Sequence, residues 1–459
     1  MGSKQNIFGI MGVFLLLTTA SCATRAATYY VATTGSDSNP GSEAAPFRTI
    51  ADAVNRMVAG DTTYVRGGTY NETETITFKK SGTASAPIRL LNAPDESPIV
   101  DFGVTEATDR IPTRRFELLA PGRTTPIGWI TIEGFEIRRA SEGIKMSNAH
   151  DITIRRNWMH HVVNQGILGS GKNVLIDRNV FNHNGAIERC ARGALNGLGT
   201  GSICNQTHSI YATGSNWVVT NNLIYDNLAY GITVSGSPWC EDGKCYGGGA
   251  QRKTDRSYAG ANGWVIANNT FAYSNHSSAI ILWMPAATNS KIINNIFYEN
   301  NQKHAGAVQG ILFSSSGGGH EIRNNLFYAT APGATTAIGG SGAGKYTESG
   351  NIVNTTLPGF VSAGPMLSGV PNLQLQPGSP AIDKGQSLSQ VTWDHAGIKR
   401  PAGASFDIGA YEFCPPSMVC ERGSPPPNPT GGGDFPSGDH PVITGPNGEI
   451  CPSPYLPIQ

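Results

Sequence analysis

Five short segments in the middle of the chain carry side chains that can exchange protons. They share an isoleucine preceded by glycine or serine, and they are Gly143-Ile-Lys145, Gly166-Ile-Leu168, Ser209-Ile-Tyr211, Gly231-Ile-Thr233 and Gly310-Ile-Leu312. Successive side chains of a strand point to opposite faces, so the residue after each inward isoleucine points outward. The outward positions hold Lys145, Leu168, Tyr211 and Thr233, and the positions two residues before each isoleucine hold Glu142, Gln165, His208 and Tyr230. Lysine, histidine and tyrosine in such columns suit general acid–base catalysis.

The catalytic interpretation assigns roles to three of these residues. His208 or Lys145 is the candidate base, and Tyr211 is the candidate acid or a combined acid and base. The structural alternative is that His208 and Tyr211 pair with a neighbouring loop and that Lys145 is an ordinary solvated side chain.

Five further residues are candidates for binding a substrate beside this column. Arg189 and Arg192 lie within a long glycine-rich stretch of sequence, and a guanidinium group can hold a carboxylate through two hydrogen bonds. The other candidates are Glu142, Gln165 and Tyr230. The alternative for the two arginines is a solvated loop surface.

A recurring phrase between residues 151 and 327 predicts the element that would hold these columns. Alternating apolar residues lead into Asn-x-x-Phe or a near variant, at Asn157, Asn179, Asn222, Asn269, Asn295 and Asn325. Such self-similarity indicates a stack of short strands, in which residues distant in sequence lie side by side. Coils of a stack are ~4.8 Å apart, so Lys145 and Tyr211, two coils apart, are expected on the order of 10 Å from each other.

The repeated asparagines and phenylalanines are expected to be structural. Asparagine tolerates left-handed backbone at a turn, and its amide can bond to the asparagine of the next coil. The phenylalanines are expected to stack in the interior, and they are Phe181, Phe271, Phe297 and Phe327.

Two long intervals interrupt the repeat, at residues 183–207 and 237–262. Both are rich in glycine and each contains two cysteines. We interpret them as loops inserted beside the face that carries the columns, because the first ends immediately before His208. An additional coil between Asn179 and Asn222 is the alternative, and it would move Lys145 and Tyr211 one step further apart.

Composition and the N-terminus limit the partners and the compartment. The 459 residues include 33 basic and 33 acidic side chains, so nucleic acid, which needs a basic surface, is not an expected partner. Residues 1–26 have the pattern of a signal peptide, whose apolar run is too short to span a bilayer. Lipidation at Cys22 is the alternative. No other segment is predicted to span a membrane, and we expect a secreted or cell-surface protein.

The eight cysteines fit an exported protein. Six lie in close pairs, and local pairing is the simplest of the connectivities that the sequence leaves open: Cys190 with Cys204, Cys240 with Cys245, and Cys414 with Cys420. Cys451 then has no partner, and no spacing resembles a zinc site. Residues 414–459 are rich in proline and glycine and are expected to form a disordered tail.

The two ends of the stack are expected to differ. In residues 28–100, apolar side chains at helical spacing from Thr49 to Met57 predict a short helix that ends at Gly60 and caps the stack. Residues 372–413 are expected to form a closing segment.

The N-terminal part resembles the start of family 9 polysaccharide lyases. The likeness rests on Tyr29-Tyr-Val-Ala-Thr-Thr-Gly-Ser-Asp-Ser-Asn-Pro-Gly-Ser42, Ala45-Pro-Phe-Arg-Thr-Ile50 and Gly60-Asp-Thr-Thr-Tyr-Val-Arg-Gly-Gly-Thr-Tyr70. The later Gly378-Ser-Pro-Ala-Ile-Asp383 and Asp407-Ile-Gly-Ala-Tyr-Glu412 are similar to the ends of exported bacterial β-helix proteins. The resemblance implies an all-β, right-handed parallel β-helix over residues 28–413, with the short helix as its cap.

One departure from that family affects the expected cofactor. Family 9 lyases hold calcium with an aspartate cluster that includes an Asp-Asp pair, and residues 129–330 contain no such pair. We therefore predict no cofactor and no metal ligands, with calcium unsupported by the residues present. The separated carboxylates that an inverting glycoside hydrolase needs are missing as well.

The resulting functional hypothesis is β-elimination on a uronate-containing polysaccharide, by a protein expected to be a monomer with an acidic glycan as its partner. The alternatives are a glycan-binding or surface protein that does not cut its ligand, a uronate epimerase, and a glycoside hydrolase on the same fold. Fold alone does not decide among them.

Overall fold

The computed structural model describes residues 2, 26–106, 113–119, 125–186, 207–235, 261–274, 277–283, 287–301, 308–314, 317–330, 336–342, 344–364 and 370–423. Several predictions from the sequence fall outside these residues. They are the apolar run of the signal peptide, Cys22, Arg189, Arg192, the cysteine pairs at 190/204 and 240/245, Cys451, and residues 424–459 of the tail. In the described part, no helix is long and apolar enough to cross a membrane.

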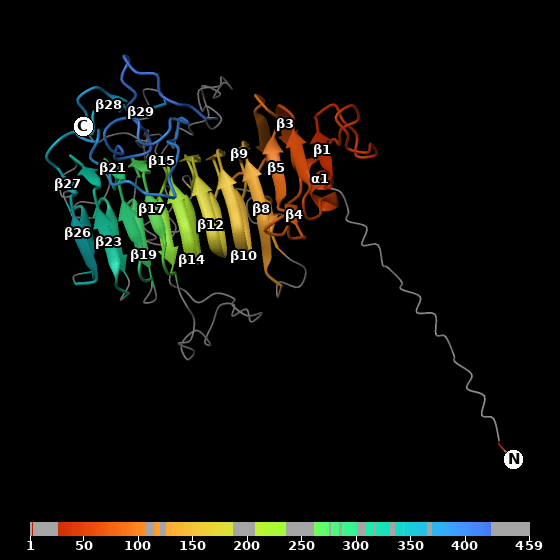
Figure 1. Cartoon of the computed structure of the whole chain (residues 1–459), viewed down its shortest axis with the longest axis horizontal. Coiled ribbons are helices and arrows are strands. Elements are labelled where there is room, and N and C mark those ends of the chain that lie inside the picture. The colour runs from red at the N-terminus through yellow and green to blue at the C-terminus, as the bar shows by residue number, and fades with distance from the viewer. Residues whose placement is uncertain are drawn as a thin grey trace, which may run out of the picture.

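The chain winds into a parallel β-helix with three faces, as Figure 1 shows. Face 1 contains β4 (Ile76–Phe78), β7 (Phe116–Leu118), the first parts of β10 (Ile144–Arg155), β12 (Ile167–Asp177) and β14 (Ile210–Thr220), then β16 (Ile232–Ser235), β19 (Ile280–Trp283), β22 (Ile311–Ser314) and β25 (Ile338–Gly340).

Face 2 begins where the three long strands bend. It contains β1 (Thr28–Val31), β2 (Thr62–Val65), β5 (Ile88–Asn92), β8 (Ile127–Glu133), the second parts of β10, β12 and β14, then β17 (Val265–Ala267), β20 (Lys291–Ile293), β23 (His320–Arg323) and β26 (Tyr346–Ser349).

Face 3 closes each coil. It contains β3 (Gly68–Asn71), β6 (Pro98–Asp101), β9 (Glu136–Arg138), β11 (Trp158–His160), β13 (Val180–Asn182), β15 (Leu223–Tyr225), β18 (Thr270–Ala272), β21 (Ile296–Tyr298), β24 (Leu326–Tyr328) and β27 (Ile352–Val353). The all-β class expected from the sequence is confirmed.

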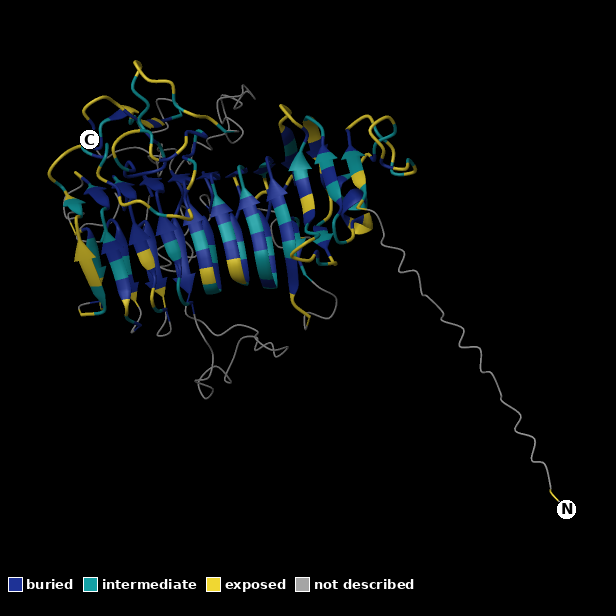
Figure 2. Cartoon of the chain, viewed as in Figure 1, coloured by how far each residue is buried: buried dark blue, intermediate teal, exposed yellow. Residues whose placement is uncertain are grey.

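The interior is filled by the alternating apolar residues of the three faces. Inward positions are buried along the whole stack, and Figure 2 shows them as dark blue bands across the strands. The predicted phenylalanine stack is present over three coils, since the rings of Phe271 and Phe297 lie 5.1 Å apart and those of Phe297 and Phe327 lie 4.6 Å apart, nearly parallel. Phe181 is also buried in the interior, but Ile224 occupies the coil between it and Phe271. One side chain per coil thus packs on the next.

The predicted asparagine ladder runs through the corner between faces 2 and 3. The side-chain amide of Asn222 donates to Asn269 Oδ1 at 2.9 Å, and Asn269 donates in turn to Asn295 Oδ1 at 3.0 Å. Each also donates to a backbone carbonyl of the preceding coil, as Asn269 does to Val219 at 2.9 Å. All members from Asn157 to Asn325 are fully buried, so the ladder satisfies polar backbone groups that water cannot reach.

The left-handed backbone at this corner belongs to a different residue than expected. Positive φ occurs one position before each ladder asparagine, at Arg156, Arg178, Asn221, Asn268, Asn294 and Asn324. The left-handed residue turns the chain sharply, and the following asparagine then aims its amide inward. The first two coils therefore use arginine at the turn, where the later coils use a second asparagine.

The short helix α1 (Ile50–Arg56) covers the first coils, as predicted. The Thr49 side chain caps its start by accepting a hydrogen bond from the Asp52 amide. Ile50, Ala53 and Val54 are buried in the same apolar core as the strands, and Figure 1 places the helix beside β1 and β4 at the N-terminal end.

The C-terminal segment packs along the side of the stack. Its residues include the antiparallel pair β28 (Phe360–Ser362) and β29 (Asn372–Leu375). Together with the outer surface of face 3 they form a second apolar cluster: Val180, Leu223, Ile296, Leu326, Phe360, Leu373, Leu375, Ala381, Ile408 and Ala410. The predicted Cys414–Cys420 disulfide is present in this segment.

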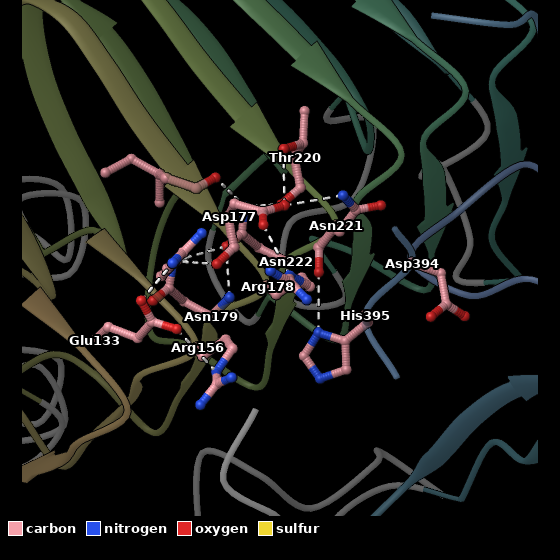
Figure 3. Close-up of polar contacts among 12 residues, drawn as sticks. Glu133, Arg156, Asp177, Arg178, Asn179, Thr220, Asn221, Asn222, Asp394 and His395 are labelled. Atoms are coloured by element: carbon pink, nitrogen blue, oxygen red, sulfur yellow. Dashed lines mark hydrogen bonds and ion pairs between the residues drawn. The ribbon is translucent and has the colours of Figure 1, made fainter. Parts of the chain in front are cut away.

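A polar network fastens this segment to the corner between faces 2 and 3 (Figure 3). Asp177 accepts hydrogen bonds from Thr220 and Asn221, while His395 Nδ1 lies 2.9 Å from the Asn221 backbone oxygen. Arg400 donates to Asn221 Oδ1 at 3.2 Å. Burial lowers the pKa of His395 to about 4, so the ring is neutral at neutral pH and donates this bond without introducing a charge.

Arg400 also forms a completely buried ion pair with Glu412. Its guanidinium donates to the backbone oxygen of Gly409, and Glu412 accepts from the amides of Ala402 and Asp407. An ion pair removed from water in this way is held by its full set of hydrogen bonds, and losing either partner leaves an uncompensated charge.

Replacing a ladder asparagine should destabilise the stack. Asn269→Ala removes the acceptor of the buried Asn222 backbone amide and the side-chain donor to the Val219 carbonyl, at an expected cost of about 1–3 kcal/mol in the free energy of unfolding. Chemical denaturation measures it. The exposed Asn55→Ala in α1 is the control and should change stability by less than about 0.5 kcal/mol; equal effects of the two variants would contradict a structural role for the ladder.

Breaking the buried ion pair should release the C-terminal segment. Arg400→Met is expected to destabilise the protein by about 3–5 kcal/mol, because it leaves Glu412 buried and charged. The double variant Arg400→Met/Glu412→Leu should recover most of that loss. Thermal unfolding of the three proteins decides, and a double variant as unstable as the single one would show that the charge is not the cause.

Candidate functional site

The strand registers of face 1 confirm the two predicted columns. Lys145 pairs with Leu168, Leu168 with Tyr211, and Tyr211 with Thr233, each on the next coil. Lys145 and Tyr211 are therefore two coils apart, about 10 Å by the usual spacing. Because β12 pairs directly with β14, the long interval between Asn179 and Asn222 adds no coil, and the loop interpretation of that interval is confirmed in this respect.

The second column lies at the start of the same strands. Backbone hydrogen bonds join Gly143 to Gln165, Gly166 to His208, and Ser209 to Tyr230, so Glu142, Gln165, His208 and Tyr230 stand on successive coils. A small residue follows each of them because the coils approach closely here. A Cβ on Gly166 would lie 2.7 Å from the Ser209 carbonyl oxygen and 2.8 Å from the Phe181 ring.

His208 is the centre of an aromatic group on this face. Its ring stacks on Tyr230 with centroids 5.5 Å apart, and it lies 5.1 Å from the Tyr211 ring. Its Nδ1 is 3.0 Å from the Thr233 hydroxyl oxygen. His208 and Thr233 are buried, while Tyr211 is half-buried.

Burial controls the protonation of this group. It lowers the pKa of His208 to about 3, so the imidazole is neutral throughout the range in which the protein is expected to work. Burial also raises the pKa of Tyr230, so that phenol keeps its proton. The Tyr211 ring therefore lies beside a neutral imidazole, which itself stacks on the neutral phenol of Tyr230.

A charged group lies on the N-terminal side of Tyr211. Arg115 donates to Glu142 Oε2 at 2.8 Å and to Glu117 Oε1 at 3.0 Å, and all three side chains are largely buried. Glu117 is in register with Lys145 on the preceding coil. The guanidinium keeps both carboxylates close together and next to Lys145.

Sequence analysis missed Arg115 and Glu117. The column predicts Glu142 as a site residue. Arg115 lies in the preceding coil, where the recurring sequence pattern is absent and the alignment of that strand with its neighbours cannot be read from the sequence. The alignment Phe116 with Ile144 would have placed them correctly, since Phe116 is the inward residue of its own strand.

The carboxylates of this face do not fit a calcium ion. Calcium takes six to eight oxygen ligands, whereas Glu117 and Glu142 are both engaged by Arg115, whose charge would repel a cation. Across the described residues, no group of three or more histidine, cysteine, aspartate or glutamate side chains is placed to hold a metal.

A segment in the N-terminal part of the chain matches a known family region. Residues 29–191 fit the family model described as "Pel9A-like, right handed beta helix region". This range includes Glu142, Lys145 and Gln165, and it ends before His208 and Tyr211. It also agrees with the predicted right-handed winding.

Two curated proteins share a short segment with the chain. Pectate lyase PEL9 of Emericella nidulans is 48% identical over 79 residues, which is 17% of this chain and 19% of that protein. The uncharacterized protein YwoF of Bacillus subtilis is 42% identical over 71 residues, 16% of this chain and 15% of its own length. The chain thus matches about a fifth or less of the length of these relatives.

Solved structures are similar at a lower level. The crystal structure of pectate lyase Pel9A has 18% identity and a TM-score of 0.45, covering 84% of this chain and 96% of that one. A rhamnogalacturonan lyase has 17% identity and a TM-score of 0.41, covering 73% and 90%.

The described coils form a parallel β-helix. Residues 29–191 fit a right-handed β-helix family region, and over a short segment the chain is similar to a pectate lyase, so it resembles β-helix proteins of the pectate-lyase type. The predicted fold and the predicted family resemblance are confirmed.

The buried imidazole should make stability depend on pH. His208 has a lower pKa when folded than when unfolded, so the unfolded chain binds more protons and stability falls as pH drops below about 6.5. His208→Phe keeps a ring on Tyr230 and removes this contribution. Between pH 7 and 4.5 the wild type should lose about 2 kcal/mol more than the variant in urea unfolding. Parallel pH curves would mean that folding does not lower the pKa of His208.

Proposed function

We propose that the protein is an exported lyase that cleaves a uronate-containing polysaccharide by β-elimination on face 1. The observation that carries the proposal is the strand register, which puts Lys145 and Tyr211 in one outward column, two coils apart. The neutral His208 ring beside Tyr211 supports it.

The reaction needs three contributions from the protein. A base removes the proton at C5 of the uronate, the electrons of that bond form the C4=C5 double bond, and the C4–O bond breaks. An acid then protonates the departing glycosidic oxygen. During the proton transfer, negative charge builds up on the carboxylate, and a cation must offset it.

Tyr211 is the residue best placed to handle both proton transfers. It is half-exposed, as Tyr230 is, and it stands in the outward column that also holds Lys145. As a phenolate its oxygen accepts the C5 proton, and the phenol so formed gives that proton to the oxygen that leaves from the same side. His208 acts as a positioning residue in this proposal, because its burial and its bond to Thr233 favour holding the Tyr211 ring over accepting a proton.

Lys145 supplies the charge that the uronate carboxylate requires. It lies on the same side of the sheet as Tyr211 and in register with Glu117 on the preceding coil. The prediction that Arg189 or Arg192 also holds the carboxylate concerns residues outside the described part and stays a prediction. Glu142, Gln165 and Tyr230 remain candidates for contacts with the sugar hydroxyls.

A glycan-binding protein without catalysis is the second candidate, since the same face would hold a sugar chain. An epimerase would share the proton abstraction at C5 but return the proton to the opposite face of the ring. A hydrolase is less favoured, because Glu117 and Glu142 are tied to one guanidinium and neither is set apart as a proton donor. The predicted signal peptide supports export to the cell surface or beyond, and the proposal is of a monomer.

Removing the Tyr211 hydroxyl should abolish cleavage. Tyr211→Phe is expected to lower kcat by roughly 100-fold or more on pectate, alginate or a glycosaminoglycan, whichever the wild type cleaves. Absorbance of the new unsaturated ends measures the rate. Tyr64→Phe, in β2 on face 2, is the control and should keep full activity. A wild type that binds these polymers without producing unsaturated ends would favour the binding protein.

Two substitutions separate the possible roles of Lys145. Lys145→Arg keeps the positive charge but cannot act as a base at neutral pH, so it should retain much of the activity, whereas Lys145→Ala should lose it. Loss of activity in both variants, with Tyr211→Phe still active, would make Lys145 the base. Added calcium or a chelator should leave the rate unchanged.

A further inference from the structure

The charge of the residues in the two columns of face 1 changes at Tyr211. On its N-terminal side, the described outward residues of the two columns include five charged side chains: Glu74, Arg114, Glu117, Glu142 and Lys145. On the C-terminal side, the described members of both columns carry no charge, and they are Tyr230, Thr233, Ser278, Ile281, Gln309, Leu312, Thr336 and Gly339. Thr233, Ser278, Ile281 and Gln309 are buried, so the accessible surface on this side is limited to the remaining members and their neighbours. The boundary falls at the coil that holds His208 and Tyr211.

The uncharged side presents an exposed tryptophan. Trp283, the last residue of β19, is 41% exposed, and it is the only aromatic residue among the large hydrophobic side chains exposed in the described part of the chain. It follows the outward Ile281 by two residues, so it points to the same side of the sheet as Tyr211. Two coils and two residues separate them, which is about 12 Å between Cα atoms.

The neighbours of Trp283 leave part of the indole uncovered. Its register partners are Ser235 and Ser314, both small, and Ser314 is exposed. Elsewhere in the stack, an aromatic residue meets another aromatic residue on the next coil, as Trp217 meets Trp264 at 4.8 Å. Among the described rings, none stacks on Trp283 in this way. Single exposed apolar residues are common, but this one lies on the face that carries the proposed site.

An indole face selects an uncharged sugar. The ring carries negative charge density on its faces, which attracts cations and the C–H groups of a pyranose and disfavours a carboxylate. With Lys145 on one side of Tyr211 and Trp283 on the other, the two sides of the site prefer residues of different charge. A span of about 12 Å is one that an oligosaccharide of a few residues bridges.

We infer that the substrate is a heteroglycan in which a uronate binds on the Lys145 side of Tyr211 and an uncharged sugar stacks on Trp283. This rests on the proposed function for the position of the reacting bond, but the stacking contact itself is independent of catalysis. A homopolymer of uronates would place a carboxylate over the indole and lose that contact.

Binding in the uncleaving Tyr211→Phe background tests the inference. Calorimetry with alternating rhamnose–galacturonate and glucuronate–N-acetylglucosamine oligosaccharides should show tighter binding of at least one of them than of an oligogalacturonate of equal length. Trp283→Ala should weaken that binding about tenfold and change oligogalacturonate binding by less than about twofold. Trp283→Phe should retain most of the affinity. Val58→Ala, equally exposed at 41% but next to α1, should change nothing.

Three results would overturn the inference. They are equal effects of Trp283→Ala on both kinds of oligosaccharide, no effect on either, and tighter binding of the oligogalacturonate by the parent protein. The inference is also overturned if the parent protein binds neither of the alternating oligosaccharides. An active Tyr211→Phe protein, by contrast, removes the proposed catalytic role and leaves the binding comparison valid, so the two failures are distinguishable.

Discussion

Fixed register between successive coils is the constraint on which the rest of the structure depends. The asparagine ladder and the phenylalanine stack repeat once per coil, and both require each coil to lie directly over the last. Each ladder amide bonds to the asparagine of the next coil and also to a backbone carbonyl of the preceding coil. A shift of one residue in the pairing of two coils would therefore leave several buried polar groups without hydrogen bonds. Side chains far apart in sequence therefore acquire defined neighbours, and the columns on face 1 are a product of that order.

The sequence predicted the features that recur in every coil, namely the strands and the columns of outward side chains. Alternating apolar residues gave the strands, and the isoleucine alignment put Lys145 and Tyr211 in one column, because inward positions recur at the same place in every coil. It did not reveal that Arg115 binds Glu142, since that contact joins residues outside the phrase. The burial of His208 was also missed, because burial depends on what covers a residue and not on the direction in which its strand sends it.

The C-terminal segment shows a second limit of sequence reasoning. The apolar residues of this segment are too few to predict where they pack. The surface that they cover is the outer side of face 3, and the sequence of the face 3 strands does not show that this outer side is buried. Packing there leaves face 1 uncovered by this segment and closes the opposite flank with Arg400 and Glu412. The outer side of face 3 is thus covered by the protein's own C-terminal segment.

The direct pairing of β12 with β14 has a consequence for how such a protein can change. These strands lie on consecutive coils although 43 residues separate Asn179 from Asn222, against 22 between Asn157 and Asn179. The pairing of consecutive coils does not depend on the number of residues that connect them. The chain between β13 and β14 can therefore change in length or sequence while the pairing of the coils stays the same. New binding specificities can arise in this way without a change in the fold.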